Sequence, residues 1–449
     1  MTDISQNPAP RKKTSLMEVD QRTRRRNAAE ARFRAYGLTA VLLGVLFVVF
    51  LAFSIVRNGI PAFSSMTVQF EFTLTQEEFD HAESQLMKTS AYQNYFNEAL
   101  SQSLAERGLD VEFDKNNLER IMGKIGGTLR EYFRENTDQL GQPVQFEVRT
   151  ASRVEGYLSG RLHRGNVSED NRFIQPADLD LIDALVEIGM IQRTFNWGFL
   201  TGADTGVDNP GGAGFGASVV GSFFMMLVVL GFSLPIGVAA AIYLEEFAPQ
   251  NRLTDFIEVN ISNLAAVPSI VFGILGLSVF IQFGGGVLGI EGLRASAPLV
   301  GGLVLTLMTL PRIIIPARAA LKAVPPSIRD AALGVGASRT QTVFHHVLPL
   351  AAPGILTGLI LGLSQALGET APLLLIGMVG LVARGYPETF AAGFTDPNSA
   401  MPAQIYTWAS RADPAFYDSA WGGIIILLVF LLSMNIVAVI LRRRFERRW

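Results

Sequence analysis

The sequence predicts an all-α protein that crosses a membrane several times and carries a small inserted α+β domain. Two bulk properties support this: 49% of the 449 residues are hydrophobic and only 17% are charged, whereas a soluble domain usually has about 25% charged residues. The third observation is that uncharged runs, long enough to cross a bilayer, alternate with stretches of soluble composition. We therefore expect a polytopic membrane protein with six transmembrane helices.

Residues 1–35 form a polar, arginine-rich tail that we expect to be a largely disordered cytoplasmic segment, with helical turns near 28–34. An uncharged run within 36–57 has about the 20 residues that a transmembrane helix needs. This run is longer than the apolar part of a signal peptide, so we expect it to stay in the protein. The arginines before it predict that the N-terminus is cytoplasmic.

Residues 58–197 are soluble in composition and predict a small α+β domain on the periplasmic side. Helical periodicity occurs at 76–107 and 118–136, and strand-like alternation occurs at 67–73 and 144–150. The length suits one independent domain. Two interpretations stay open, because no site stands out: the domain is a spacer that packs on the membrane part, or it binds a partner.

Five more apolar runs follow in residues 198–449, the predicted core. Their lengths are near or above what a crossing needs, and prolines within them predict tilts or breaks. Six crossings in total return the arginine-rich C-terminal end to the cytoplasmic side, where positive charge is favoured. The predicted crossings of the core are 219–244, 259–283, 297–315, 350–380 and 422–441.

The loop over residues 324–349 predicts two short helices joined by a sharp bend on the cytoplasmic side. Pro326 suits the first turn of a helix, where its missing N–H is not needed. Gly336 suits the bend, because glycine tolerates a positive φ. The residues that we expect to form a docking surface for a partner are Asp330, Ala331, Ala332, Gly336 and Pro349.

The spacing in this loop resembles the EAA loop of ABC-type import permeases, in which E-A-A precedes a glycine and a later L-P. Asp330 stands in place of the glutamate, and His346 stands where an aliphatic residue is usual. The resemblance implies a coupling helix that fits a cleft on an ATP-hydrolysing subunit. The alternative is an ordinary amphipathic cytoplasmic loop.

One carboxylate, Glu369, lies in the fifth predicted crossing. A charge within a membrane is costly unless it is paired or hydrated, which makes this residue a functional candidate. The surrounding GETAPL sequence of residues 368–373 resembles the membrane subunits of the phosphate-specific transport system, the PstA type more than the PstC type. Similar segments occur at 199–202, 241–247 and 404–409, so the resemblance covers residues 198–449.

An ionised carboxylate repels phosphate, so we expect Glu369 to pair with an arginine of this chain or of a partner. Arg312 and Arg318, near the end of the preceding crossing, are the local candidates. The family often has arginine where this chain has Gln365 and Ile315. The alternative is that Glu369 only braces neighbouring helices through a hydrogen bond. Neutral donors expected along the path are Ser364, Gln365 and Thr370.

The resemblance implies a permease subunit of an ATP-driven importer for inorganic phosphate in the bacterial inner membrane, with the five-helix core of a type I ABC importer. It implies as partners a PstC-like permease, two PstB-like ATPase subunits and a PstS-like phosphate-binding protein, besides membrane lipid. ATP and Mg would be bound by the ATPase subunits, and no cofactor by this chain. Residues 1–197 resemble an N-terminal extension found in some bacterial relatives.

Two other functions compete with this interpretation. The first is the same machine for another oxyanion, such as sulfate or molybdate. The second is a transmembrane sensor, for which the tails are too short to hold a signalling domain. The sequence contains no Walker loop, no nucleophile motif and no spacing of metal ligands, and its net charge of −3 gives no basic surface for nucleic acid. We therefore expect a non-catalytic subunit without a metal.

Overall fold

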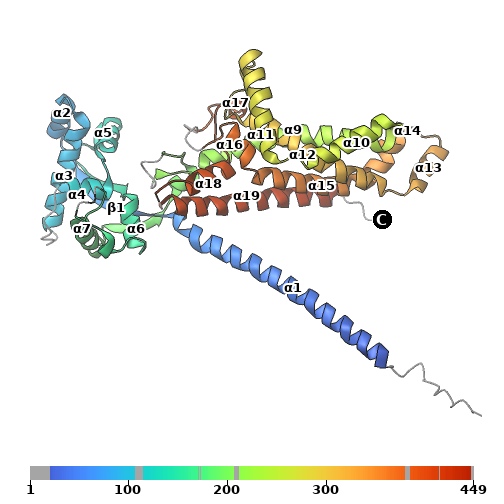
Figure 1. The fold of residues 1–449 in the computed structure, drawn as a ribbon. Coiled ribbons are helices and arrows are strands. Elements are labelled where there is room, and N and C mark those ends of the chain that lie inside the picture. Colours follow the sequence, from blue (N-terminus) through green and yellow to red (C-terminus); the bar gives the residue numbers. More distant parts are fainter. Residues whose placement is uncertain are drawn as a thin grey trace, which may run out of the picture. The chain divides into compact units, whose positions relative to one another are not determined.

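The computed structural model describes residues 21–106, 115–169, 171, 173–206, 212–379, 385–413 and 415–445 (Figure 1). The chain divides after Arg57 into two compact units. The first unit contains most of one long helix, α1 (Gln21–Gly59). Residues 21–35, expected to be largely disordered, are the first turns of this helix, since arginine and alanine favour a helix that the apolar run continues. Residues 1–20 of the predicted tail lie outside the described residues.

Six helices among the described residues are long and apolar enough to cross a membrane, as the sequence predicts. Besides α1, each consists of one helix or of consecutive helical segments. They are α9 (Gly216–Ile242) with η5 (Tyr243–Phe247), α11 (Ser269–Leu275) with η6 (Gly276–Val287), α12 (Pro298–Lys322), α14 (Arg339–Thr342) with η7 (Val343–Val347) and α15 (Leu348–Gly368), and α19 (Ala415–Phe445).

Two of the predicted crossings begin or end elsewhere in the structure. The run 259–283 is split, because α10 (Arg252–Ala265) ends before Pro268 and the crossing begins at α11. A proline lacks the N–H that a continuous helix would need, and it disfavours a helical residue before it. The run 350–380 is also broken: α15 ends at Gly368, and the short helix α16 (Ala371–Leu375) follows.

Helix α12 lies at the centre of the membrane core and packs against both α9 and α15. Close approach of these helices depends on glycine. A Cβ at Gly302 would come within 2.4 Å of the Val228 side chain, and one at Gly358 within 2.7 Å of Pro316. Small residues allow membrane helices to pack closely, so the positions of α9 and α15 are fixed relative to α12.

The α+β domain has a three-stranded antiparallel sheet with the order β2-β1-β3. It has a core of its own, in which Phe72, Phe96 and Phe133 are buried. The two predicted strands are present as β1 and β2, whereas the sequence analysis missed β3. The strands are β1 (Ser64–Thr73), β2 (Pro143–Arg149) and β3 (Ile191–Phe195), and the helices are α2 (Gln76–Ser84), α3 (Lys88–Glu106), α4 (Lys115–Met122), α5 (Gly126–Glu135), α6 (Ser152–Leu158) and α7 (Pro176–Glu187).

Both ends of this domain meet the membrane core at one place. Ser64 at the start of β1 pairs with Phe195 at the end of β3. The next residue, Asn196, donates a hydrogen bond from Nδ2 to the Ala62 carbonyl at 3.1 Å. The domain is therefore an insertion whose two ends lie side by side. The short helices that join it to the core and close the core's loops are η1 (Ile60–Phe63), α8 (Trp197–Thr201), α17 (Ala392–Thr395) and α18 (Met401–Ala409).

Candidate functional site: a docking segment and a membrane ion pair

The predicted docking loop consists of two helices joined by a bend. Helix α13 (Pro326–Gly334) begins with Pro326 at its first position, as predicted. The bend contains Gly336, whose φ of 91° is a conformation that glycine adopts without strain. Helix α14 begins after Ser338, whose side chain and that of Gln341 form a reciprocal capping box. The loop therefore has a defined shape, which its own sequence specifies.

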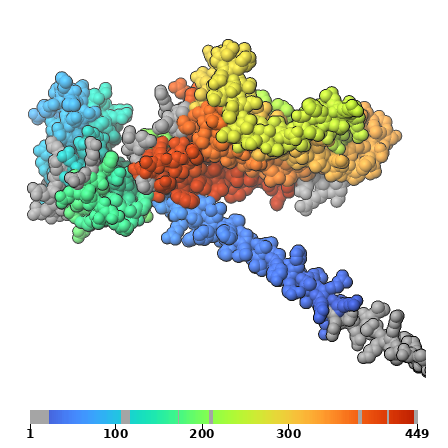
Figure 2. Space-filling model, in the orientation of Figure 1, coloured from blue at the N-terminus to red at the C-terminus, as the bar shows by residue number. Residues whose placement is uncertain are grey.

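One face of this segment is exposed, and Figure 2 shows α13 in orange on the surface. Asp330, Ala331 and Gly336 are exposed, and so are the apolar side chains of Leu333 and Val335, the latter by 86%. Two of the predicted docking residues lie differently: Ala332 is buried and Pro349 is half-buried. The exposed face at this bend is the surface that the docking prediction requires.

The docking segment is continuous with the membrane core. From Ser338, the chain runs through α14 and the π-helical turn η7 into α15 without a loop. Val343 and Val347 of η7 are buried in one cluster with Ile314 of α12 and Ile242 of α9. The segment therefore has no slack between it and the packed helices of the core, because close-packed interiors deform little.

Glu369 lies at the end of α15, rather than within a continuous helix as the sequence analysis expected. Its Oε1 is 3.7 Å from Nη1 of Arg312 in α12, and both side chains are largely covered, at 18% and 25% exposure. Nη1 of Arg312 has no hydrogen-bond partner among the described residues. The two charges thus attract each other, and Nη1 of Arg312 is a buried donor without an acceptor among the described residues.

Of the other predicted path residues, Thr370 directly follows Glu369, whereas Arg318 and Ser364 have other partners. Arg318, two turns further along α12, forms an ion pair with Glu258 at 2.7 Å. Ser364 donates a hydrogen bond to Asn435 of α19 at 2.7 Å. Gln365 is exposed, and Thr370 lies half-buried in the break before α16. Of the two arginines that the sequence analysis offered as partners for Glu369, the structure places Arg312 beside it.

Several polar side chains of the core were not predicted from the sequence. Ser233 of α9 and Thr309 of α12 are fully buried, and the Ser233 hydroxyl has no hydrogen-bond partner among the described residues. Both lie within apolar runs, and a polar residue in such a run is a signal that could have identified them. Arg329 and Glu246, which pair in the structure, were also missed.

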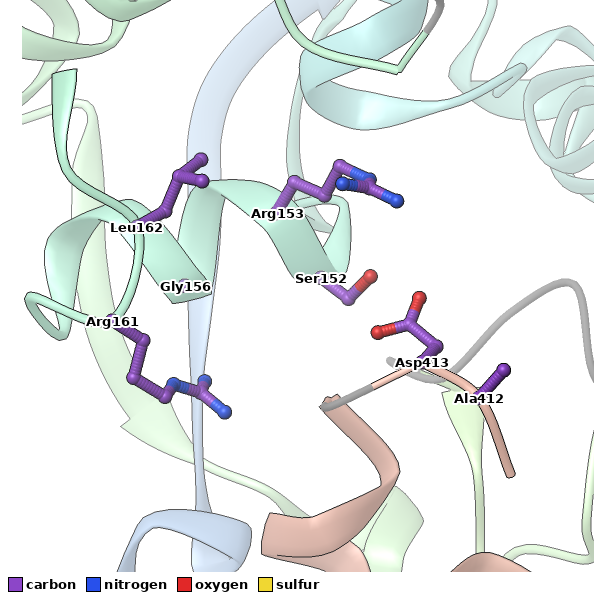
Figure 3. A pocket seen from close by; sticks show the side chains of 7 residues that line it. All are labelled: Ser152, Arg153, Gly156, Arg161, Leu162, Ala412 and Asp413. Carbon is purple, nitrogen blue, oxygen red and sulfur yellow. The ribbon is translucent and has the colours of Figure 1, made fainter. Parts of the chain in front are cut away.

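A cavity of about 400 Å³ lies between the α+β domain and the loop before α19 (Figure 3). The side chains of Ser152 and Asp413 point toward each other across it. Its two arginines are engaged: Arg161 pairs with Asp418 at 2.5 Å, and the Arg153 guanidinium lies 4.5 Å from the centre of the Phe173 ring. No residue of the docking segment lines the cavity. We interpret the cavity as part of the interface between the α+β domain and the membrane core.

Comparison with known proteins identifies the membrane core. Residues 233–449 match the family described as "Binding-protein-dependent transport system inner membrane component". A phosphate transport system permease protein PstA of Mycobacterium leprae is 30% identical over 234 residues, which are 51% of this chain and 71% of the relative. The chain belongs to this family of transport permeases. Its core is PstA-like, as the GETAPL resemblance indicates.

Other comparisons extend this result. A probable ABC transporter permease protein, YqgI of Bacillus subtilis, is 29% identical over 265 residues, which are 58% of this chain and 86% of the relative. Among solved structures, the inward-facing MetNI methionine ABC transporter has 16% identity and a TM-score of 0.37, over 52% of this chain and 94% of that chain. Residues 20–167 match a family described as "Domain of unknown function (DUF3333)". The family match and the PstA relative, together with the six candidate membrane helices, make the protein a multi-pass permease subunit of an ABC transporter, and a second family region precedes its core.

Proposed function

We propose that this permease is the PstA-like subunit of an ATP-driven importer for inorganic phosphate. One structural observation carries the proposal: an exposed docking segment runs without interruption into α15, which ends at Glu369 opposite Arg312. This arrangement links a surface for an ATPase to a charged site within the membrane core. Relatives named as phosphate transport permeases support the choice of substrate.

The partners follow from this assignment. A PstC-like permease would form the other half of the path, and a PstS-like protein would deliver phosphate from the periplasm. Two PstB-like ATPase subunits would bind and hydrolyse ATP with Mg, one of them docked on residues 324–349. Both termini and the docking segment are then cytoplasmic, and the α+β domain is periplasmic, in the inner membrane of a bacterium. This chain itself catalyses no reaction.

The ion pair suggests how an anion could pass a carboxylate. Phosphate accepts hydrogen bonds from arginine more strongly than from neutral donors. Because Arg312 is held near Glu369 without a hydrogen bond between their closest atoms, its guanidinium can bind phosphate while the carboxylate orients it. Broken membrane helices, such as α15 and α16 here, are typical of transporter substrate sites. ATP-driven closure of the ATPase subunits would then rock the two permeases, and the path would open to each side of the membrane in turn.

Uptake of radiolabelled phosphate by cells that depend on this chain and its partners tests the proposal. We expect uptake to be lost without the chain, and to be inhibited by excess unlabelled phosphate but not by sulfate or molybdate. Inhibition by sulfate or molybdate, with uptake of either ion, would assign the permease to another oxyanion. Complete uptake without the chain would overturn the transport function. Cells that carry the partners alone are the control.

A further inference from the structure

Two adjacent carboxylates lie in the helical turn that directly follows α9. Glu245 and Glu246 lie in η5, the π-helical turn over Tyr243–Phe247. Carboxylates are unfavourable at a helix C-terminus, because the backbone carbonyls there already carry partial negative charge. Glu246 is also buried, with 7% exposure, and π-helical turns often mark functional sites. A buried acid at this position requires a strong partner.

Arg329 of the docking helix α13 is that partner. Its Nη2 donates to Glu246 Oε1 at 2.5 Å and its Nε donates to Oε2 at 3.2 Å, so the contact is bidentate. The same guanidinium donates to the carbonyls of Val324 at 2.7 Å and Leu321 at 2.9 Å, where α12 ends. The hydrogen bond to Glu246 raises the pKa of Arg329 above its usual value. The Arg329 side chain thus joins α13 to Leu321 of α12 and to η5, the turn that follows α9.

Arg329 directly precedes Asp330, but the two residues face different ways. Asp330 is exposed on the docking face, while Arg329 is 22% exposed and engaged in the interior contact. The residues beside Glu246 make parallel contacts: Arg318 reaches Glu245 at 3.4 Å, and the Arg339 guanidinium lies 5.6 Å from the Phe247 ring centre. Three consecutive residues of η5 therefore each contact a different arginine of the segments that follow.

We propose that the Arg329–Glu246 pair is the link that transmits movement of the docking helix α13 to α9 and α12. This proposal rests on the proposed transport function, because it assigns a path for the force that an ATPase applies. Arg329 is a positioning residue, because the role proposed for it is to hold α13 against α12 and η5. Its planar, bidentate geometry resists rotation in a way that a single contact of a lysine would not.

The test uses the full complex with its ATPase subunits, and compares uptake per ATP hydrolysed in four variants. Arg329→Met and Glu246→Gln remove the link, and we expect the ratio to fall at least about fivefold, while the ATPase subunits still copurify. The double variant Glu246→Arg with Arg329→Glu exchanges the charges, and we expect it to recover part of the ratio. Lys322→Met, which removes an exposed cation at the end of α12, is the matched control.

Hydrogen exchange of η5 provides a readout that does not require transport. In the wild-type complex we expect nucleotide to change the exchange of residues 243–247, and in Arg329→Met we expect this change to be absent. A nucleotide-dependent change that persists in Arg329→Met, or a ratio equal to that of Lys322→Met, would overturn the link. If the wild type transports an oxyanion other than phosphate, and nucleotide changes the exchange of residues 243–247 in the wild type but not in Arg329→Met, the substrate assignment fails and the link stands.

Discussion

Arg312 and Glu369 belong to successive crossings of the membrane core, and their charged atoms lie 3.7 Å apart, an ion pair without a hydrogen bond. Glu369 ends α15, where the helix dipole disfavours a carboxylate. Arg312 therefore offsets two free-energy costs: that of removing the Glu369 charge from water, and that of placing a carboxylate at the C-terminal end of a helix. This relationship makes the role of Glu369 testable.

We expect Glu369→Gln to lower phosphate uptake by about tenfold, the effect of about 1.4 kcal/mol on a transition state, with normal assembly. Glutamine keeps the size and a hydrogen-bonding oxygen but loses the charge that orients Arg312. Uptake by cells and the amount of complex in membranes measure the two effects. Normal uptake would favour the alternative in which Glu369 only braces helices, because an amide can brace equally well.

Arg312→Gln should behave differently, because it leaves Glu369 without a partner in the core. An unpaired charge within a membrane protein costs about 3 kcal/mol or more, so we expect less assembled permease. The double variant Arg312→Gln with Glu369→Gln should restore the amount of complex but not the uptake. Equal amounts of complex in Arg312→Gln and the wild type would contradict a stabilising pair.

Gly336 offers a test of the docking segment. We expect Gly336→Leu to lower transport-linked ATP hydrolysis several-fold, because a side chain is added on the exposed face and the positive φ is strained by roughly 1–2 kcal/mol. Gly123→Leu is the matched control: this glycine also has a positive φ and open space around it, but it lies in the α+β domain. Unchanged hydrolysis in Gly336→Leu would refute docking at this bend.

The sequence predicts the membrane helices well, because apolar length alone determines whether a helix can cross a bilayer. It predicts their ends less well, since Pro268 and the Glu369 break act locally within long apolar runs. The first turn at Pro326 and the bend at Gly336 are local features, and the two helices of the docking loop were therefore predicted, whereas the burial of Ala332 was not.

Contacts between distant segments could not be predicted in the same way. Arg329 and Glu246 are 83 residues apart. Nothing in the sequence near either residue indicates that these two charges form a pair. The choice of Arg312 over Arg318 as the partner of Glu369 likewise depends on how α12 and α15 are rotated against each other, which packing decides. Strand β3 was missed because its five residues form a short edge strand with only weak alternation.

A buried network in the α+β domain predicts a large effect on stability. Asp178 is fully buried and accepts hydrogen bonds from Arg120 and Asn117. We expect Asp178→Ala to destabilise the domain by about 3–5 kcal/mol, because Arg120 is left as an unpaired charge. Hydrogen exchange of α4 and α7 in the whole protein measures this. Asp180→Ala, on the same helix but in an exposed ion pair with Arg164, should have little effect, and equal effects would contradict the argument.

The same domain should lose stability in acid. A hydrogen bond from Arg130 holds the pKa of Glu83 at about 2, below its usual 4.5. A lowered pKa in the folded state contributes stability above the unfolded value and loses it as pH falls toward the folded value. We expect exchange in α3 and α5 to rise as pH falls from 4.5 toward 2, after correction for intrinsic rates. Glu83→Gln should lack this dependence; a wild-type slope in that variant would assign it to another group.

The adjacent ends of the α+β domain predict that it can be removed. Because Ser64 pairs with Phe195, a short linker can replace residues 65–194 without moving η1 or α8. We expect the shortened chain to insert and to assemble, since the membrane helices have a separate core. Asp418→Asn should be included, because Asp418 loses its partner Arg161. Gel filtration and phosphate uptake are the measurements. Aggregation would show that the folding of the core depends on the domain. Full uptake by the shortened chain would show that the domain is a spacer. Loss of uptake by a complex that still assembles would indicate that the domain binds a partner.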